Sequence, residues 1–441
     1  MNISRLFAGH LLWRGLYLLT STLVTILMAR YLEAAATGWV FYFISWLSFF
    51  FLAATFGMDA SITYFVSSGK AKTGEMLLFS LSWVLLVTLL AAFIIFGCYR
   101  NQNEYMKPLS SQWAALFFIA GNLLITFLNS LFYSRRDFVT PNILFVTVNL
   151  FLIGWLLTSK TGSPLQIGSL TFLEVYFVLI LVQGVACLIL FLTKQKNELQ
   201  LTCPSPDLLR QVLAYSGIAY LANLTFFACT RIDYWILEAY GVNEASLGNY
   251  IQSSRLVQLF QLLPAMLAAS IFPIAAAGHE EKMKEGILKL ARLVFLFYSV
   301  PVLFFILFGN WLFPFLFGRS FDEMYPVFLI LLPGLFALSA LALISAYFAA
   351  INRIIHNFKI SIAGLLLILI GDLLFIPKWG IYGAAWVSSA GYIFCFAGSL
   401  WFFKNETKLS WIDFFKPRLS DFSFLRSVIS RMFLKSTNHQ P

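Results

Sequence analysis

Residues 215–237 read YSGIAYLANLTFFACTRIDYWIL, and residues 250–264 read YIQSSRLVQLFQLLP. Both apolar stretches belong to runs long enough to cross a bilayer as a helix, which takes about 20 residues at ~1.5 Å per residue. They nevertheless hold Arg231, Asp233 and Arg255. A charge at that depth costs at least about 2.5 kcal/mol, so such residues face a wet cavity or a partner and mark a ligand or ion path. The two stretches therefore predict the transport route of a membrane carrier.

The composition is that of an all-α polytopic membrane protein. Of the 441 residues, 60% are hydrophobic and only 11% are charged, and the mean hydropathy is +0.81, whereas about a quarter of a soluble domain is charged. The five cysteines and four histidines are scattered without a C-x-x-C pair. We therefore expect no disulfide framework, metal site or cofactor. The chain also has no G-x-x-x-x-G-K-[ST] loop, so ATP is not expected to drive it.

Apolar runs predict about twelve transmembrane helices, six in each half of the chain. The runs are residues 10–30, 38–57, 76–98, 112–133, 142–158 and 170–193 in the first half, and 212–239, 250–277, 289–309, 326–351, 358–376 and 381–403 in the second. Basic residues gather on the loops of one side, among them Lys70, Lys72, Arg135, Arg136 and Lys194. The positive-inside rule then places both termini in the cytoplasm. This asymmetry explains most of the net charge of +10 without a nucleic-acid partner.

The two halves resemble copies of each other. Three short segments of the first half resemble segments at corresponding places in the second half: Phe132–Arg136 resembles Ala350–Arg353, Asn149–Ile153 resembles Asp372–Ile376, and Tyr31–Gly38 resembles Tyr240–Gly248. An even number of helices per copy predicts parallel repeats, with a transport site at their interface near the middle of the membrane. We expect six-helix bundles over residues 1–200 and 201–403. Residues 404–441 are expected to form a basic amphipathic cytoplasmic tail on anionic lipid.

Polar residues inside the predicted helices fall on stripes, which point into a bundle. Arg14 and Tyr17 share such a stripe in the first helix. Arg231 and Asp233 are two residues apart, so they project in nearly opposite directions and cannot pair with each other. Several alternatives stay open. Arginines near helix ends can snorkel to the interface, Asp59 can cap a helix, and the glutamines of the eighth run can join helices.

Residues 371–386 read GDLLFIPKWGIYGAAW and resemble the N-x-x-x-I-P-x-x-G-x-x-G-A-A signature of polysaccharide-biosynthesis flippases. These form a family of the multidrug/oligosaccharidyl-lipid/polysaccharide exporter (MOP) superfamily. Other pieces of the resemblance are Ala29–Leu32 with Gly38, Gly57–Ala60, Arg231–Asp233, Gly248–Tyr250, Phe272–Pro273 and Leu316–Phe321. It spans nearly the whole chain in the right order. It departs at Asp372, where the family usually has Asn. Asp372 is then either protonated in the bilayer or a site of ion coupling.

The resemblance implies two six-helix bundles around a central cavity that opens alternately to the two sides. Its cargo would be an undecaprenyl-pyrophosphate-linked oligosaccharide, carried from the inner to the outer leaflet of the bacterial cytoplasmic membrane for O-antigen-type polysaccharides. The expected partners are this glycan, membrane lipids, a polysaccharide polymerase and glycosyltransferases. The carrier itself is expected to be a monomer. Guanidinium groups suit the pyrophosphate, and ring, amide and hydroxyl groups suit the sugars. The candidate substrate ligands are therefore Arg14, Tyr17, Asn223, Arg231, Gln252 and Arg255, and the candidates for ion coupling are Asp233, Asp372 and Asp59.

Two other classes of protein are weighed against this one. A cation-coupled multidrug exporter of the same superfamily would favour acidic residues in its cavity, whereas this chain offers more arginine. An oligosaccharide polymerase or lipid-linked glycosyltransferase would carry catalytic residues on a sizeable outer loop, and the connections here are too short for one. We therefore expect no catalytic residue and no enzymatic activity.

Overall fold

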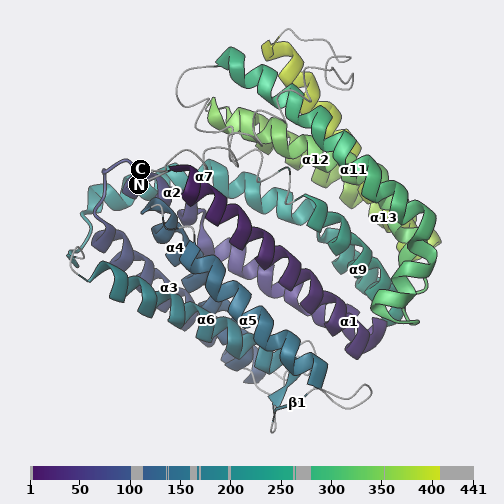
Figure 1. Ribbon diagram of the computed structural model, residues 1–441, viewed down its shortest axis with the longest axis horizontal. Coiled ribbons are helices and arrows are strands. Elements are labelled where there is room, and N and C mark those ends of the chain that lie inside the picture. Colours follow the sequence, from purple (N-terminus) through teal and green to yellow (C-terminus); the bar gives the residue numbers. More distant parts are fainter. Residues whose placement is uncertain are drawn as a thin grey trace, which may run out of the picture. The chain divides into compact units, whose positions relative to one another are not determined.

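The computed structural model describes residues 3–100, 113–135, 137, 139–158, 166–167, 170–196, 200–261, 264, 280–351 and 353–407 (Figure 1). The helices are α1 (Ile3–Thr55), α2 (Met58–Ser67), α3 (Thr73–Arg100), α4 (Trp113–Ser134), α5 (Val139–Thr158), α6 (Phe172–Gln195), α7 (Pro206–Cys229), α8 (Ile232–Ala239), α9 (Glu244–Phe260), α11 (Glu280–Phe317), α12 (Met324–Ala350) and α13 (Ile354–Thr407). Strands β1 (Gln166–Ile167) and β2 (Leu170–Thr171) form an antiparallel pair. The predicted tail beyond residue 407 and the Phe272–Pro273 motif lie outside the described residues.

The chain folds into two compact units that are not consecutive in sequence. Unit 1 comprises Met1–Tyr31 and Phe43–Tyr220, and unit 2 comprises Leu32–Tyr42 and Leu221–Pro441. The start of α7 thus belongs to unit 1, where the Ser61 and Ser216 hydroxyls lie 2.6 Å apart. A short piece of α1 belongs to unit 2. The division into bundles at residue 200 stays a prediction.

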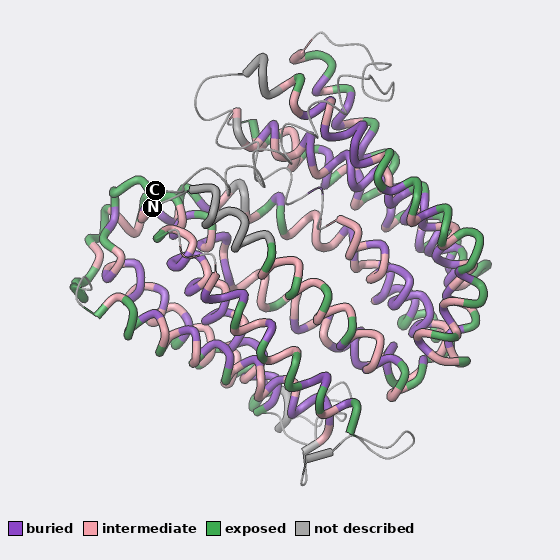
Figure 2. The backbone as a smooth tube through the Cα atoms, in the orientation of Figure 1, coloured by how far each residue is buried: buried purple, intermediate pink, exposed green. Residues whose placement is uncertain are grey.

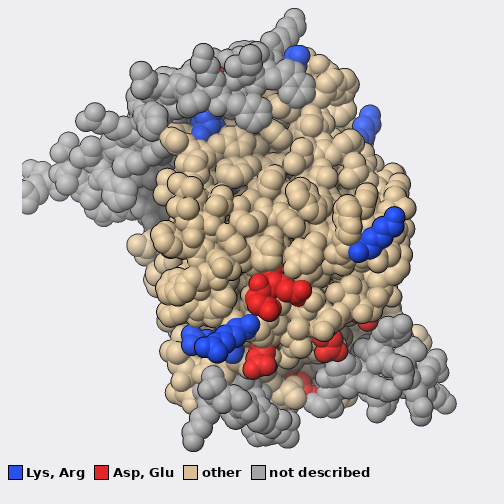
Figure 3. Space-filling model, turned by 90° about the vertical axis from the view of Figure 1, so that its right-hand side faces the viewer, with Lys and Arg blue, Asp and Glu red and all other residues tan. Residues whose placement is uncertain are grey.

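Nine helices of the described chain are long and apolar enough to span a membrane, which makes this a multi-pass membrane protein. Two of them run for 44 and 54 residues, or about 66 and 81 Å, far more than the ~30 Å of a bilayer core. Each breaks once, α1 at Glu33 (φ 60°) and α13 at Gly380 (φ 52°). Each therefore holds two of the predicted crossings. Most of the surface in Figure 3 is neither acidic nor basic, as a lipid-facing surface requires.

Each unit is built around one central helix. The apolar window of α4 is 78% buried and that of α12 is 72% buried, whereas no other spanning helix of the described chain exceeds 39%. In unit 1, α4 packs against α2, α3, α5 and α6; in unit 2, α12 packs against α9, α11 and α13 (Figure 2). These helices correspond to the fourth and tenth predicted crossings, which are the same position in the two repeats.

Two glycines at matching positions of the repeats meet inside unit 2. A Cβ added to Gly38 would lie 2.6 Å from the Gly248 Cα, and one added to Gly248 would lie 1.9 Å from the Ala34 carbonyl oxygen. Ser320 secures the crossing, because its hydroxyl accepts from the Ala34 amide (3.1 Å) and its carbonyl accepts from the Asn249 side chain (3.0 Å). Any side chain at the crossing would force the two backbones apart.

Gly248→Ala tests this crossing. We expect it to lower the free energy of unfolding by about 1–3 kcal/mol, the usual cost of overpacking, seen as a lower thermal midpoint of the purified protein. Gly286→Ala is the matched control, because a Cβ there meets nothing within 4 Å. In a helix interior alanine is favoured over glycine by about 0.5–1 kcal/mol. An equal effect of the two variants would show that the crossing is not tight.

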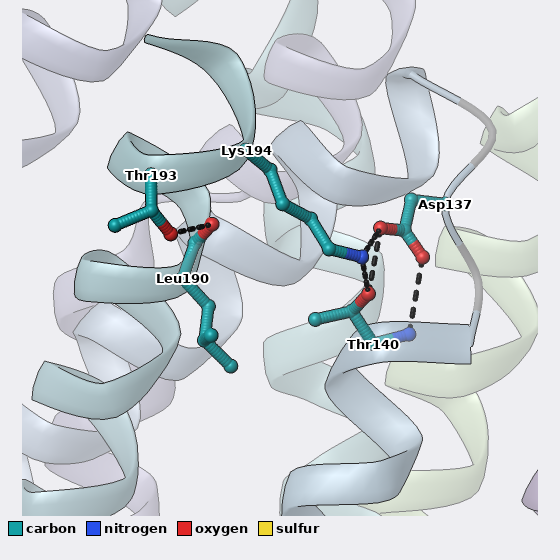
Figure 4. Close-up of polar contacts among 5 residues, drawn as sticks. All are labelled: Asp137, Thr140, Leu190, Thr193 and Lys194. Carbon is teal, nitrogen blue, oxygen red and sulfur yellow. Dashed lines mark hydrogen bonds and ion pairs between the residues drawn. The ribbon is translucent and has the colours of Figure 1, made fainter.

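A small polar cluster joins α5 to α6 in unit 1 (Figure 4). Lys194 Nζ lies 2.9 Å from Asp137 Oδ2 and also contacts the Thr140 hydroxyl. The Thr140 amide donates to Asp137 Oδ1 (3.0 Å) and its hydroxyl to Oδ2 (2.7 Å), which caps the first turn of α5. Burial raises the pKa of the Asp137 carboxyl, but the hydrogen bonds from Thr140 and Lys194 and the Lys194 charge outweigh it and hold this pKa below its ordinary value.

Asp137→Asn removes the charge and keeps an acceptor for the Thr140 amide. Because the pKa of Asp137 is lowered on folding, its charge stabilises the native state above the unfolded pKa of about 3.9 and ceases to do so as the pH falls below that range. We expect the variant to lose up to about 1 kcal/mol at pH 7, since the pair is partly exposed. The loss should vanish near pH 3. Thermal midpoints at the two pH values measure it, and a pH-independent difference would contradict the role of the charge.

Candidate functional site

A helix break lies at the centre of the charged stretch. The predicted helix over residues 212–239 is wrong in one respect, because it is two helices, α7 ending at Cys229 and α8 starting at Ile232. Between them, the Thr230 amide donates to the Phe227 carbonyl and the Arg231 amide to the Ala228 carbonyl, both at 3.1 Å. These turn hydrogen bonds satisfy the Phe227 and Ala228 carbonyls, two of the groups that the end of α7 leaves without a partner inside the helix.

The break presents Arg231 to α9. Its guanidinium donates to the Tyr234 hydroxyl (2.8 Å), the Gln258 side-chain oxygen (2.6 Å) and the Thr230 carbonyl (3.2 Å). The Arg231 Cζ lies 5.1 Å from the centre of the Tyr234 ring. All of these acceptors are neutral, and within the described residues no carboxylate forms an ion pair with Arg231. The hydrogen-bond partners of this half-buried group therefore bring no negative charge to it.

Arg255 lies on α9 in the same unit. Its guanidinium stacks on Phe41, with Cζ 3.3 Å from the ring centre. Phe41 comes from the piece of α1 that belongs to unit 2. Tyr234 lies close enough to both Arg231 and Arg255 to interact with their charges. The Asp233 carboxyl lies near Tyr234 as well, so two guanidiniums and one buried acid surround this tyrosine in unit 2.

The two other predicted sugar ligands of unit 2 differ from these arginines in how far they are exposed to solvent. Asn223 is exposed on α7, whereas Gln252 is only 2% exposed and its side-chain oxygen has no hydrogen-bond donor within the described chain. A fully buried amide does not reach a large glycan without a rearrangement of α9. Their role in binding stays a prediction.

Two carboxyl groups are fully buried in unit 2. Asp233 accepts hydrogen bonds from the Ser388 hydroxyl (3.0 Å), the Tyr234 amide (3.0 Å) and the Tyr250 hydroxyl. Asp372, on α13, is equally buried, but neither of its oxygens meets a donor among the described residues. The two groups are near enough for their charges to interact. Arg231 and Asp233 thus take different partners.

Unit 1 holds the remaining predicted residues. Arg14 lies with its Cζ 5.5 Å from the Tyr17 ring, which packs at 4.9 Å against Phe145. No carboxylate in the described part of the chain pairs with Arg14. Asp59 lies in the first turn of α2, where the helix N-terminus favours a negative charge.

The sequence did not single out several residues on which this geometry depends. They are Phe41, Tyr234 and Ser388. Only the Arg231–Tyr234 pair carried a local signal, because residues three apart on one helical turn lie side by side. The others reach the charged groups from distant helices, which hydropathy does not reveal.

The sequence of residues 167–326 matches the family model of the polysaccharide biosynthesis proteins. No curated protein matches the chain. The resemblance seen in the sequence is thus confirmed over the middle third of the chain.

Solved structures with the same fold cover almost the whole chain. The lipid II flippase MurJ in an inward closed conformation has a TM-score of 0.64 and 16% identity, over 99% of this chain and 93% of that one. An inward-facing multidrug resistance MATE family transporter of the MOP superfamily has a TM-score of 0.63 and 16% identity, over 96% of each chain. The bent form of the Vibrio cholerae MATE transporter VcmN has a TM-score of 0.61 and 14% identity, over 94% of this chain and 99% of that one. These likenesses confirm the predicted fold class, and the proteins named are transporters rather than enzymes.

The two buried aspartates should respond differently to removal of their charge. Asp233→Leu leaves the Tyr250 and Ser388 hydroxyls without their acceptor, so we expect a loss of about 1–3 kcal/mol in the free energy of unfolding. Asp372→Leu removes a buried carboxyl group that no donor of the described chain satisfies, so stability should stay unchanged or rise. Thermal midpoints of both purified variants compare them. Equal losses would contradict the difference in partners.

Proposed function

We propose that this chain, which has the fold of the MOP superfamily and matches the polysaccharide biosynthesis family model over residues 167–326, is a flippase for lipid-linked oligosaccharides. Its cargo is an undecaprenyl-pyrophosphate-linked repeat unit of an O-antigen-type polysaccharide. Alternating access carries this lipid from the inner to the outer leaflet of the bacterial cytoplasmic membrane, with both termini of the chain in the cytoplasm. The polymerase and glycosyltransferases that use and make the cargo are its functional partners.

The observation that carries this proposal is the set of neutral partners around two membrane-embedded guanidiniums. Arg231 donates to an amide, a hydroxyl and a backbone carbonyl, and Arg14 lies beside a tyrosine ring. A cation in a membrane helix is costly and is retained where it serves a function. An unneutralised guanidinium attracts an anion, and its planar donors match phosphate oxygens.

Arg231 retains donors for such a ligand. A guanidinium has five N–H groups, and the hydrogen bonds to Thr230, Tyr234 and Gln258 use three of them. The other two can bind a pyrophosphate oxygen while Tyr234 and Gln258 hold the group in place. An inside-negative potential favours outward movement of the anionic linker by about 2.3 kcal/mol per charge per 100 mV. The potential can therefore supply part of the driving force.

Asp233 and Asp372 form the proposed ion-coupling site. A buried carboxylate without hydrogen-bond donors is strongly disfavoured unless a proton or cation neutralises it. Asp372 lacks donors in the described chain, whereas Asp233 has three. Uptake and release of a proton or a small monovalent cation at Asp372 would change the charge beside Asp233 and Tyr250. Such a change can shift the packing of α8 against α13.

A second candidate function is cation-coupled export of multidrug-type substrates. The specific observation in its favour is the buried acidic pair in unit 2, together with the fold that the chain shares with MATE transporters. Its substrates are organic cations, which the guanidiniums of Arg231 and Arg255 would repel. The choice of cargo therefore separates the two functions.

Reconstituted vesicles loaded with a fluorescent undecaprenyl-pyrophosphate oligosaccharide test the proposal. Loss of a charge-assisted hydrogen bond costs about 1.5–3 kcal/mol, so we expect Arg231→Gln and Arg14→Gln each to slow translocation at least about tenfold. Lys289→Gln is the control, because Lys289 pairs with Glu285 one turn away on α11. Normal translocation by both arginine variants would overturn the flippase assignment. Ion-driven export of an organic cation without lipid translocation would establish the second candidate.

A further inference from the structure

One half of the Arg231 guanidinium is held by a single side chain. Nη1 donates to the Tyr234 hydroxyl (2.8 Å) and to the Thr230 carbonyl (3.2 Å), which accounts for both of its N–H groups. Among the described residues, Nη2 donates only to the side-chain oxygen of Gln258 (2.6 Å). The N–H groups that remain are one on Nη2 and the one on Nε. The position of Gln258 therefore decides where the remaining Nη2 donor points.

One face of α9 lies along the break between α7 and α8. Tyr250, Ser254 and Gln258 follow one another at intervals of four residues, which places them on the same side of a helix. Tyr250 donates to the Asp233 carboxyl, and Gln258 accepts from Arg231. Ser254 thus lies on α9 between the two contacts that this helix makes with the charged groups of the break.

The Ser254 hydroxyl meets both side chains that bind the Arg231 guanidinium. The amide nitrogen of Gln258 donates to Ser254 Oγ (3.3 Å). The Tyr234 side chain interacts with Ser254 as well. Ser254 is only 4% exposed, so water cannot readily take the place of its hydroxyl. A single buried oxygen therefore supports the partners of both halves of the guanidinium.

The chemistry of a guanidinium decides which end of the Gln258 amide faces it. A guanidinium has N–H donors and no acceptor, so only the amide oxygen can bind it. The amide nitrogen then needs an acceptor on its other side, and within the described chain Ser254 Oγ is the acceptor that it has. An N–H group without an acceptor costs free energy. Loss of the Ser254 hydroxyl would therefore favour other rotamers of Gln258, in which the amide oxygen leaves Nη2.

We propose that Ser254 is a positioning residue of the transport site. The role rests on the proposed function, in which Arg231 binds the pyrophosphate of the cargo. Ser254 holds the amide nitrogen of Gln258, the amide oxygen of Gln258 holds Nη2, and the remaining donors of Arg231 keep a fixed direction for the phosphate oxygens. Ser254 acts on affinity through the guanidinium and makes no contact with the cargo.

Calorimetry of the full-length protein with inorganic pyrophosphate tests this role. We expect Ser254→Ala to weaken binding about three- to tenfold, which corresponds to one neutral hydrogen bond, and Arg231→Gln to weaken it at least about tenfold. Ser253→Ala is the matched control. Ser253 is also buried, but its hydroxyl contacts the carbonyls of Asn249 (2.8 Å) and Met324 (2.9 Å). Its loss should lower the thermal midpoint and leave the affinity for pyrophosphate unchanged.

A double-mutant cycle separates positioning from a general loss of structure. Gln258→Leu removes the side chain through which Ser254 acts. In that background we expect Ser254→Ala to weaken pyrophosphate binding by less than about twofold further, because residues that act through one another do not have additive effects. Losses that multiply in the double variant would show that the two residues act independently, and would contradict the role of Ser254.

The outcomes separate the role of Ser254 from the proposed function. Pyrophosphate binding that Arg231→Gln weakens and Ser254→Ala does not would overturn the role of Ser254 and leave the anion site at Arg231 intact. Equal losses of affinity in Ser253→Ala and Ser254→Ala would assign the effect to the packing of α9, and would also overturn that role. Absence of pyrophosphate binding, or binding that Arg231→Gln leaves intact, would overturn the anion site itself and the positioning role with it.

Discussion

In the bilayer core, every backbone amide and carbonyl has to find its partner within the protein. The turn at Thr230 and Arg231 supplies partners for the Phe227 and Ala228 carbonyls and interrupts a membrane helix at the same time. The interruption sends the Arg231 guanidinium to Gln258 on α9 and the Asp233 carboxyl to Ser388 on α13. One turn of backbone thereby fixes α8, α9 and α13 relative to one another. It also gives Arg231 and Asp233, two residues apart, different hydrogen-bond partners.

The two repeats agree in architecture and differ in charge. Each surrounds a buried fourth helix, and each contributes one glycine to the crossing in unit 2. Their polar contacts have diverged: the arginine that meets Gln195 in one copy meets Glu406 in the other. The buried aspartates are likewise confined to unit 2. Because both repeats share the same helical scaffold, the functional assignments rest on the polar and charged residues that differ between them.

Local sequence patterns were sufficient for the membrane fold and insufficient for the partners of the charged groups. Hydropathy predicted the multi-pass helices, and helical geometry predicted that Arg231 and Asp233 would not pair. Neither pattern predicted the helix break before Arg231, because no glycine or proline marks this break in the sequence. Ser388 lies 155 residues from Asp233 in sequence. Such contacts are set by tertiary packing, which a single sequence does not display.

The interleaving of the units has a consequence for biosynthesis. The Ala34 amide binds the Ser320 hydroxyl, 286 residues later, and at a synthesis rate of about 5–20 residues per second that partner follows after roughly 15–60 s. Ser61 likewise waits for Ser216, 155 residues later. The earliest helices are therefore inserted long before their neighbours exist. Unit 2 includes Leu32–Tyr42, so a gene fragment encoding only the second half of the chain would yield an incomplete core of that unit.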